Sequence, residues 1–227
     1  MNNSEFDYTE RPKQFERDDF WRQVRRTVNG EPIAEAQIRM IVGQIVSSLQ
    51  LNPDDRLLDI GCGNGALSVR LEPYVGTLLG FDRSQYLIEI ANEHFASSKM
   101  RFEHRLLEHA LARHDAAFGD FNKCLLYGVA PYLADDMVVG VVQRFFERNS
   151  GALMLGNERD RNAAAEFFGE KLNTAELDDT GTSVGKWRTQ AWYEELAADL
   201  GIQVRFLKMP QEFYAAKRYF DVVFTKG

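Results

Sequence analysis

Several features that would assign this sequence to a particular class of protein are missing. None of its 227 residues belongs to a run near the ~18 to 20 unbroken apolar residues of a membrane-spanning helix. It has two cysteines, Cys62 and Cys124, which are too far apart for a C-x-x-C zinc or redox motif. The first 20 residues are polar and mixed in charge, unlike a signal or transit peptide. We therefore expect a cytoplasmic protein with reduced thiols and no membrane span.

An excess of positive charge is also missing. The 27 Lys and Arg residues are outnumbered by 34 Asp and Glu residues, giving a net charge of −7. Broad nucleic-acid surfaces need basic patches that release counterions, so we expect no nucleic-acid partner and a small-molecule ligand instead. The four histidines and the acidic residues show no metal-ligand spacing, which predicts no metal site.

What the sequence does contain is an alternation of short apolar runs with amphipathic ones. With 44% hydrophobic residues the chain can bury a sizeable core. Strands are predicted at 56–61, 77–82, 100–106, 121–128, 152–157, 203–209 and 219–226, and helices at 17–28, 33–51, 66–74, 84–96, 137–149, 163–172 and 190–201. This alternation predicts an α/β fold with a mostly parallel seven-stranded sheet and helices on both faces. No helix separates the last two strands, so the last strand is predicted to be antiparallel.

The regions outside this alternation predict the domain organisation. Residues 1–50 read as an arm followed by an N-terminal helical cap, and residues 51–227 as the core, together one structural domain. The segment 173–189 is rich in Gly, Thr, Ser and Asp and is long for a loop in a compact domain. It is therefore a candidate substrate loop or lid.

The most informative stretch is "DRLLDIGCGNGALSVRL", residues 55–71. A predicted strand ends at Asp59, and glycines at 61, 63 and 65 lead toward a predicted helix. Such glycines let backbone approach a ligand closely. The next strand, "TLLGFD", ends at Asp82, where a carboxylate can accept the hydroxyls of a ribose. A dinucleotide fingerprint would instead have its third glycine one residue later.

The segments "LLDIGCGNGALS" and "GFDRS" resemble the class I, Rossmann-like S-adenosylmethionine-dependent methyltransferases of small-molecule type. The resemblance covers residue 55 to the C-terminus, including the final strand pair. It implies S-adenosylmethionine as cofactor and S-adenosylhomocysteine as product. It also implies cofactor-binding roles for a set of residues around the glycine loop and the strand ends: Asp59, Gly61, Cys62, Gly63, Asn64, Gly65, Asp82, Arg83, Leu106, Leu107 and Tyr127.

The acceptor side of the resemblance involves the ends of two later strands. "LLYGVAPYL" resembles the family segment at the methyl-transfer face, which places Tyr132 near an acceptor. In "GNERDRNAAAEFF", Asn157 and Arg161 are candidate acceptor contacts, and Glu158 or Asp160 a candidate base. Helix capping by Asp160 explains the same charges equally well.

The acceptor itself is predicted only by class. A weak resemblance to methyltransferases of bacterial surface-polysaccharide pathways suggests O-methylation of a sugar or another hydroxylated metabolite. Two alternatives remain open: a catalytically silent cofactor-binding subunit, and an NAD(P)-dependent oxidoreductase. The sequence does not indicate an oligomeric state.

Overall fold

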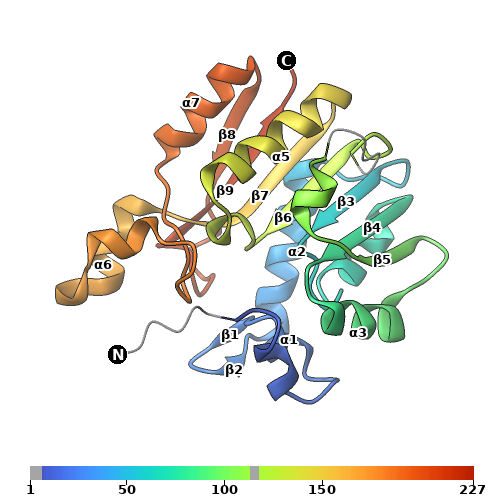
Figure 1. The fold of residues 1–227 in the computed structure, drawn as a ribbon, viewed down its shortest axis with the longest axis horizontal. Helices are drawn as coiled ribbons and strands as arrows, with labels where there is room; N and C mark the ends of the chain where they lie inside the picture. Colours follow the sequence, from blue (N-terminus) through green and yellow to red (C-terminus); the bar gives the residue numbers. More distant parts are fainter. Residues whose placement is uncertain (1–6, 113–117) are drawn as a thin grey trace.

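A computed structural model describes residues 7–112 and 118–227. Figure 1 shows one sheet between two layers of helices, with the N-terminal segment across one end of it. The strands of the sheet are β3 (Arg56–Ile60), β4 (Thr77–Asp82), β5 (Met100–His104), β6 (Lys123–Tyr127), β7 (Ala152–Arg159), β8 (Gln203–Leu207) and β9 (Tyr219–Thr225).

The strand order is β5-β4-β3-β6-β7-β9-β8. Neighbouring strands from β5 to β7 pair in parallel, while β9 is antiparallel to both β7 and β8. The predicted α/β fold with an antiparallel last strand is confirmed. Because β9 lies between β7 and β8, both of its edges are paired and its centre is buried.

Helices cover both faces of the sheet. The helices are α1 (Phe20–Gln23), α2 (Glu35–Leu49), α3 (Gln85–Phe95), α4 (Leu107–Ala110), α5 (Asp135–Arg148), α6 (Ala164–Phe168) and α7 (Gln190–Leu200). One apolar core contains residues of α5 and α7, and the other contains residues of α2 and α3. In α2, Ile38, Ile41 and Ile45 recur at helical spacing and are completely buried, as the sequence predicts.

The N-terminal region differs from the predicted arm and helical cap. Of the first predicted helix only α1 forms, and a small hairpin follows it, with strands β1 (Thr27–Val28) and β2 (Glu31–Pro32). The second predicted helix, α2, packs against the sheet, where it contacts β7. Part of the predicted arm forms a 3-10 helix, Arg11–Gln14, in which Pro12 is buried.

Two further helix predictions are corrected. The predicted helix at 66–74 is a 3-10 helix, Ser68–Tyr74, which contains Pro73. Proline lacks the N–H that an α-helical hydrogen bond needs at that position. The predicted helix at 163–172 is divided into short α and 3-10 segments around Gly169, whose φ is +54°.

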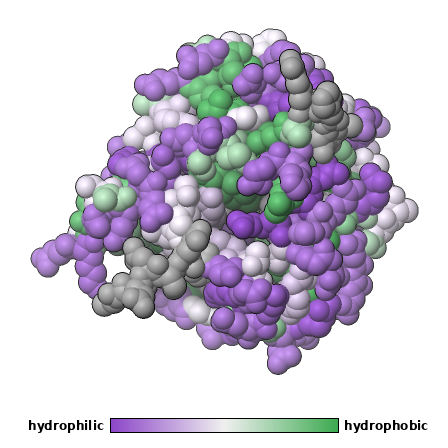
Figure 2. Space-filling model, viewed as in Figure 1, coloured by the Kyte–Doolittle hydropathy of each residue, from purple (hydrophilic) through white to green (hydrophobic). Residues whose placement is uncertain are grey.

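The surface on the side shown in Figure 2 is mostly hydrophilic, and hydrophobic residues show through only in limited areas. Among the described residues the large hydrophobic side chains exposed by more than a third are Val28, Tyr74, Leu106 and Tyr214. Within the described ranges, no helix is both long and apolar enough to span a bilayer.

Candidate active site

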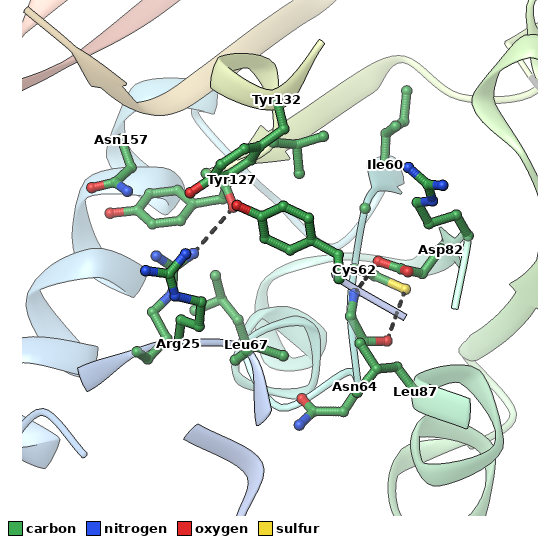
Figure 3. A pocket seen from close by; sticks show the side chains of 18 of the residues that line it. Arg25, Ile60, Cys62, Asn64, Leu67, Asp82, Leu87, Tyr127, Tyr132 and Asn157 are labelled. Atoms are coloured by element: carbon green, nitrogen blue, oxygen red, sulfur yellow. Dashed lines mark hydrogen bonds between the residues drawn. The ribbon is translucent and has the colours of Figure 1, made fainter. Parts of the chain in front are cut away.

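A cavity of about 580 Å³ lies at the carboxyl ends of β3, β4, β6 and β7. Its volume is within the range of cavities that hold cofactors and small ligands, and this edge of a parallel sheet is where ligands bind in open α/β folds. Figure 3 shows Cys62, Asn64 and Asp82 on one side of the cavity and Tyr127, Tyr132 and Asn157 on the other.

The glycine loop after β3 forms one wall. Gly61, Gly63 and Gly65 have φ angles of +73°, +57° and +77°, a region that favours glycine. The loop is fixed because the N–H groups of Gly61 and Cys62 both donate to the carbonyl oxygen of Phe81, at 2.8 and 3.1 Å. Gly61, Cys62, Gly63 and Asn64 line the cavity. Gly65 does not, since it packs against Phe102.

Asp82 ends β4 beside this loop. One of its carboxylate oxygens accepts the N–H of Gly63 at 3.0 Å, and the other accepts the N–H of Ser84 at 2.8 Å. Each oxygen keeps a second lone pair, so the carboxylate can still accept two neighbouring hydroxyl groups. Burial raises the pKa of Asp82 above its ordinary value.

Asp59, at the end of β3, is 4% exposed. Its Oδ2 accepts a hydrogen bond from the Ser68 hydroxyl at 2.6 Å. Burial raises the pKa of Asp59 to about 6; the hydrogen bond from Ser68 opposes this rise, the nearby charge of Asp82 adds to it and Arg26 also opposes it. A cationic ligand group would relieve this buried carboxylate.

Arg26 is a cavity residue that the sequence does not predict. Its Nη2 donates to the carbonyl oxygen of Tyr127 at 3.1 Å, and its guanidinium carbon lies 4.6 Å from the centre of the Tyr127 ring. In the sequence, Arg26 lies within the predicted helix 17–28. In the structure, the chain leaves α1 and enters the β1–β2 hairpin there, and this brings Arg26 to the cavity. Asp59 and Arg26 thus place a negative and a positive group at the same end.

The N-terminal segment closes this end of the cavity. The Asn64 amide donates to the backbone oxygen of Phe20 and to the side-chain oxygen of Gln23, both at 2.8 Å. Further along, the ring centres of Tyr8 and Tyr132 are 4.5 Å apart. The segment also supplies Pro12, Trp21, Val24, Arg25 and Thr27 to the lining. We call residues 8–27 the N-terminal cover.

The segment after β5 forms the wall next to Asp82. Leu106 is 37% exposed and Leu107 is buried, and both line the cavity, as do Arg83, Arg105 and Glu108. Both leucines thus line the cavity, and their cofactor-binding role stays a prediction.

A β-bulge near the end of β7 decides which of its side chains face the cavity. Between the pairs Leu155–Val222 and Glu158–Phe220, β7 has one residue more than β9. Asn157 lies in the bulge with a φ of +64°, and its N–H donates to Oδ1 of Asp221 at 2.8 Å. A bulge of this kind reverses the facing of the residues beyond it.

The bulge turns Glu158 away from the cavity, contrary to the prediction that it faces the ligand. Its Oε2 accepts the hydroxyl of Tyr193 on α7 at 2.5 Å, and the residue is 1% exposed. Burial raises the pKa of Glu158 to about 7. Although that value suits a base, Glu158 does not line the cavity. We assign it no catalytic role.

The other two charged residues of this segment also lie outside the cavity lining. Asp160 caps the following 3-10 helix by accepting the N–H of Asn162 at 3.0 Å, which corresponds to the capping alternative. Arg161 pairs with Asp178 at 2.8 Å. The prediction that both residues face the ligand is corrected, because their side chains have structural partners elsewhere.

Asn157 and Tyr132 do line the cavity, together with Arg159, which the sequence analysis did not select. Nη2 of Arg159 donates to the Tyr132 hydroxyl at 2.7 Å. The loop 173–189 contributes Ser183 and Val184 to the lining, and its role as a substrate loop stays a prediction.

Comparison with known proteins shows which family a part of this chain resembles. Residues 57–148, from β3 to the end of α5, match the family model described as "Methyltransferase domain". These residues, less than half of the chain, thus match a methyltransferase domain. The sequence resemblance implies S-adenosylmethionine as cofactor, and a solved structure of the same fold, a magnesium protoporphyrin IX methyltransferase, contains it.

Named relatives agree with this assignment. A probable cobalt-precorrin-6B C(15)-methyltransferase (decarboxylating) from Methanococcus maripaludis strain C5 is 30% identical over 108 residues, which are 44% of this chain and 53% of that protein. The chain thus matches about half the length of this relative.

Two of the solved structures that share this fold are methyltransferases. Magnesium protoporphyrin IX methyltransferase from Synechocystis PCC 6803, with bound S-adenosylhomocysteine, has a TM-score of 0.64 and 16% identity, covering 92% of this chain and 94% of that one. The N-methyltransferase NodS from Bradyrhizobium japonicum WM9 has a TM-score of 0.57 and 18% identity, covering 85% and 97%.

The residues around the cavity fit the cofactor. Two carboxylates at neighbouring strand ends retain free acceptor positions, a cation lies beside one of them, and added Cβ atoms would clash around the glycine loop. At Gly61 such an atom would lie 2.4 Å from the Val129 side chain, and at Gly63 it would lie 2.8 Å from Val24. Glycine at both positions therefore lets the loop keep its path without displacing Val129 or Val24.

Proposed function

We propose that this protein transfers a methyl group from S-adenosylmethionine to a small hydroxylated acceptor. The observation that carries the proposal is the position of Asp59 and Asp82 at the ends of adjacent strands, on either side of the glycine loop and inside one cavity. The cobalt-precorrin and magnesium protoporphyrin methyltransferases that the chain resembles support an acceptor of small-molecule size.

The amino-acid end of the cofactor would lie between Asp59 and Arg26. The buried carboxylate matches an ammonium group, and the guanidinium matches a carboxylate. Asp82 would accept the two ribose hydroxyls through the lone pairs that its backbone hydrogen bonds leave free. Leu106, Leu107 and Arg83 would enclose the adenine. Cys62 and Tyr127, both buried, would give this end an apolar lining.

The acceptor would lie on the opposite wall, against Tyr132 and Asn157. When bound, S-adenosylmethionine supplies a methyl group that its sulfonium already activates. The protein then has to align an acceptor oxygen with that methyl group and exclude water. The N-terminal cover and the loop 173–189 serve the second task, since both line the cavity.

Oxygen methylation also releases a proton. The carboxylates that line the cavity within the described ranges are Asp59, Asp82 and Glu108, all on the β3–β5 side. We therefore propose that the Tyr132 hydroxyl accepts a hydrogen bond from the acceptor hydroxyl, and that the proton leaves to solvent through the cavity mouth. Sugars remain within this class of acceptors.

The oxidoreductase alternative has less support than methyl transfer. Dinucleotide-binding sheets are built from two parallel halves in the order 3-2-1-4-5-6, whereas here an antiparallel β9 is inserted between β7 and β8. We expect NAD to show no binding in calorimetry.

The test of the proposed function is calorimetry with S-adenosylmethionine, S-adenosylhomocysteine and NAD on the parent chain and on two variants. Asp82→Ala removes two hydrogen bonds to a charged acceptor, so we expect affinity for the first two ligands to fall about 100-fold. Asp199→Ala, an exposed aspartate of α7 outside the cavity lining, is the matched control and should bind like the parent.

Three results would contradict the proposal. Equal affinity of Asp82→Ala and parent would place the cofactor elsewhere, and NAD binding would favour the oxidoreductase. Cofactor binding with no methyl transfer to any hydroxylated acceptor would instead favour the catalytically silent subunit.

A further inference from the structure

Arg159 is a buried cation in the wall of the cavity that lies opposite the cofactor carboxylates. It is 6% exposed, and its guanidinium carbon lies 5.0 Å from the ring centre of Tyr132 and 5.7 Å from that of Tyr219. Nη2 donates to Tyr132, but Nε and Nη1 have no hydrogen-bond partner among the described residues. Three N–H bonds of a buried charged group are therefore unsatisfied.

The carboxylates nearest to Arg159 in sequence form no hydrogen bond with it. Glu158, on the opposite face of β7, accepts the Tyr193 hydroxyl at Oε2, while its buried Oε1 has no hydrogen-bond partner among the described residues. Asp160 caps a helix and lies 3.7 Å from Lys208. In the part of the chain that the structure describes, no ion pair of Arg159 is found. Buried guanidinium groups normally have anionic or hydrogen-bonding partners, because desolvating an unpaired charge is unfavourable.

We propose that the acceptor carries an anionic oxygen group, a carboxylate or a phosphate, that binds to Arg159. This inference rests on the proposed function and narrows its acceptor class to hydroxylated acids. The anion would accept hydrogen bonds from the Nε and Nη1 groups of Arg159, which lack a partner among the described residues. The rings of Tyr132 and Tyr219 would hold the guanidinium in place. The rest of the acceptor would contact aromatic side chains of the same cavity, namely Tyr8, Phe167 and Tyr214.

Arg26 does not compete for this role. It donates to the Tyr127 carbonyl, and its charge acts on Asp59 at the cofactor end. The two arginines therefore serve two different anions, the cofactor carboxylate at Arg26 and the acceptor acid at Arg159.

The experiment uses the full chain saturated with S-adenosylhomocysteine and pairs of probes that differ in charge. The pairs are glucuronate with glucose and 4-hydroxybenzoate with 4-hydroxybenzamide, and glucose 6-phosphate tests a phosphate source. Calorimetry should show at least one acid binding more than about tenfold more tightly than its neutral partner. Tight binding of the carboxylate probes alone, of the phosphate probe alone, or of both would show which anionic group Arg159 recognises.

Variants then test the residue. Arg159→Met keeps the apolar stem but removes the charge, and should abolish the preference for the acid while leaving affinity for S-adenosylhomocysteine unchanged. Arg161→Met, two residues along and paired with Asp178 outside the cavity lining, is the matched control and should keep the preference. Thermal unfolding of the ligand-free Arg159→Met protein should be unchanged or higher, because an unsatisfied buried charge has been removed.

Other outcomes would overturn the inference. Equal binding of acids and neutral partners, or no binding of any acid, would show that Arg159 is not an anion site. Weaker S-adenosylhomocysteine binding in Arg159→Met with an unchanged acid preference would assign Arg159 to the cofactor. A lower unfolding temperature of that variant, with acid binding intact, would make the residue structural. Failure of S-adenosylhomocysteine itself to bind the parent would contradict the proposed function instead.

Discussion

At the scale of single residues, the cavity is lined by charges that are poorly solvated when no ligand is bound. Asp59 and Arg159 are both buried at strand ends, one with a raised pKa and the other with unsatisfied N–H bonds. Such groups reduce the stability of the folded chain, and ligands of opposite charge restore it. Ligand binding and stability should therefore respond in opposite directions when one of these charges is removed.

Asp59→Asn should show this opposition. The pKa of Asp59 is about 6 in the folded protein against an ordinary 3.8, so the folded state holds its proton more tightly than the unfolded state. The parent consequently loses stability as the pH rises from about 4 to 6, by up to about 3 kcal/mol. Asn keeps the oxygen that accepts from Ser68, and the variant should unfold at a higher temperature than the parent at pH 7.5 but not at pH 4.

Cofactor binding should show the reverse pattern for the same variant. The parent needs an ionised Asp59 to bind an ammonium group, so its affinity for S-adenosylhomocysteine should fall below about pH 6. The Asn variant should bind weakly with no pH dependence in this range. Thermal unfolding and calorimetry between pH 4 and 8 measure both effects. Parallel pH profiles for parent and variant would mean that Asp59 does not hold the ammonium.

At the scale of elements, the N-terminal cover and the glycine loop depend on each other. A Cβ on Gly63 would lie 2.8 Å from Val24, so Gly63→Ala should displace the cover and weaken cofactor binding by about tenfold or more. Gly30→Ala is the matched control, because Gly30 also has a positive φ (+85°) but no atom within 4 Å of the added Cβ. Calorimetry with S-adenosylhomocysteine compares them. Equal losses would attribute the effect to backbone strain alone.

Elements with a strong hydrophobic period were predictable from the sequence, and those fixed by contacts between distant segments were not. The buried strands β3, β4 and β6 lie close to their predicted positions because each is a short apolar run. The helices α2, α3, α5 and α7 do so because their apolar residues recur at helical spacing. The β1–β2 hairpin has two residues in each strand and a partly exposed pattern, so nothing in it opposes a helix prediction.

The same limit applies to the site. Asp59, the glycine loop and Asp82 were predictable because each follows directly from the end of a strand. Which of Glu158 and Arg159 points into the cavity was not predictable. It depends on one extra residue in β7, and this bulge is stabilised by Asp221 of the distant strand β9. Alternation without the bulge places Glu158 in the cavity and Arg159 behind the sheet.

At the scale of the whole molecule, cofactor binding should link the N-terminal cover to the core. With S-adenosylhomocysteine at about 100 times its Kd, the free energy of unfolding should rise by about 2.7 kcal/mol. For a chain of this size that corresponds to an increase of roughly 5 to 10 °C in Tm. Limited proteolysis with trypsin should show slower cleavage at Arg25 and Arg26 in the bound protein.

The control for this experiment is cleavage outside the cover. Arg148, at the end of α5 and far along the chain from the cover, should be cut at a rate that follows global stability alone. If the ligand slows cleavage at Arg25 and Arg26 no more than at Arg148, the cover does not close over the cofactor.

Whether the acceptor wall carries a negative or a positive charge depends on the register of β7. The bulge sets this register, and the residues of the strand could stay the same. The sequence "NERD" contains alternating anions and cations, and one extra residue selects the cation for the cavity. Deletion of a single residue at the bulge would present Glu158 in its place, and the wall would then suit cationic acceptors such as amines. A family of such chains could therefore exchange acidic substrates for basic ones through an insertion or deletion, with every charged residue of the strand retained.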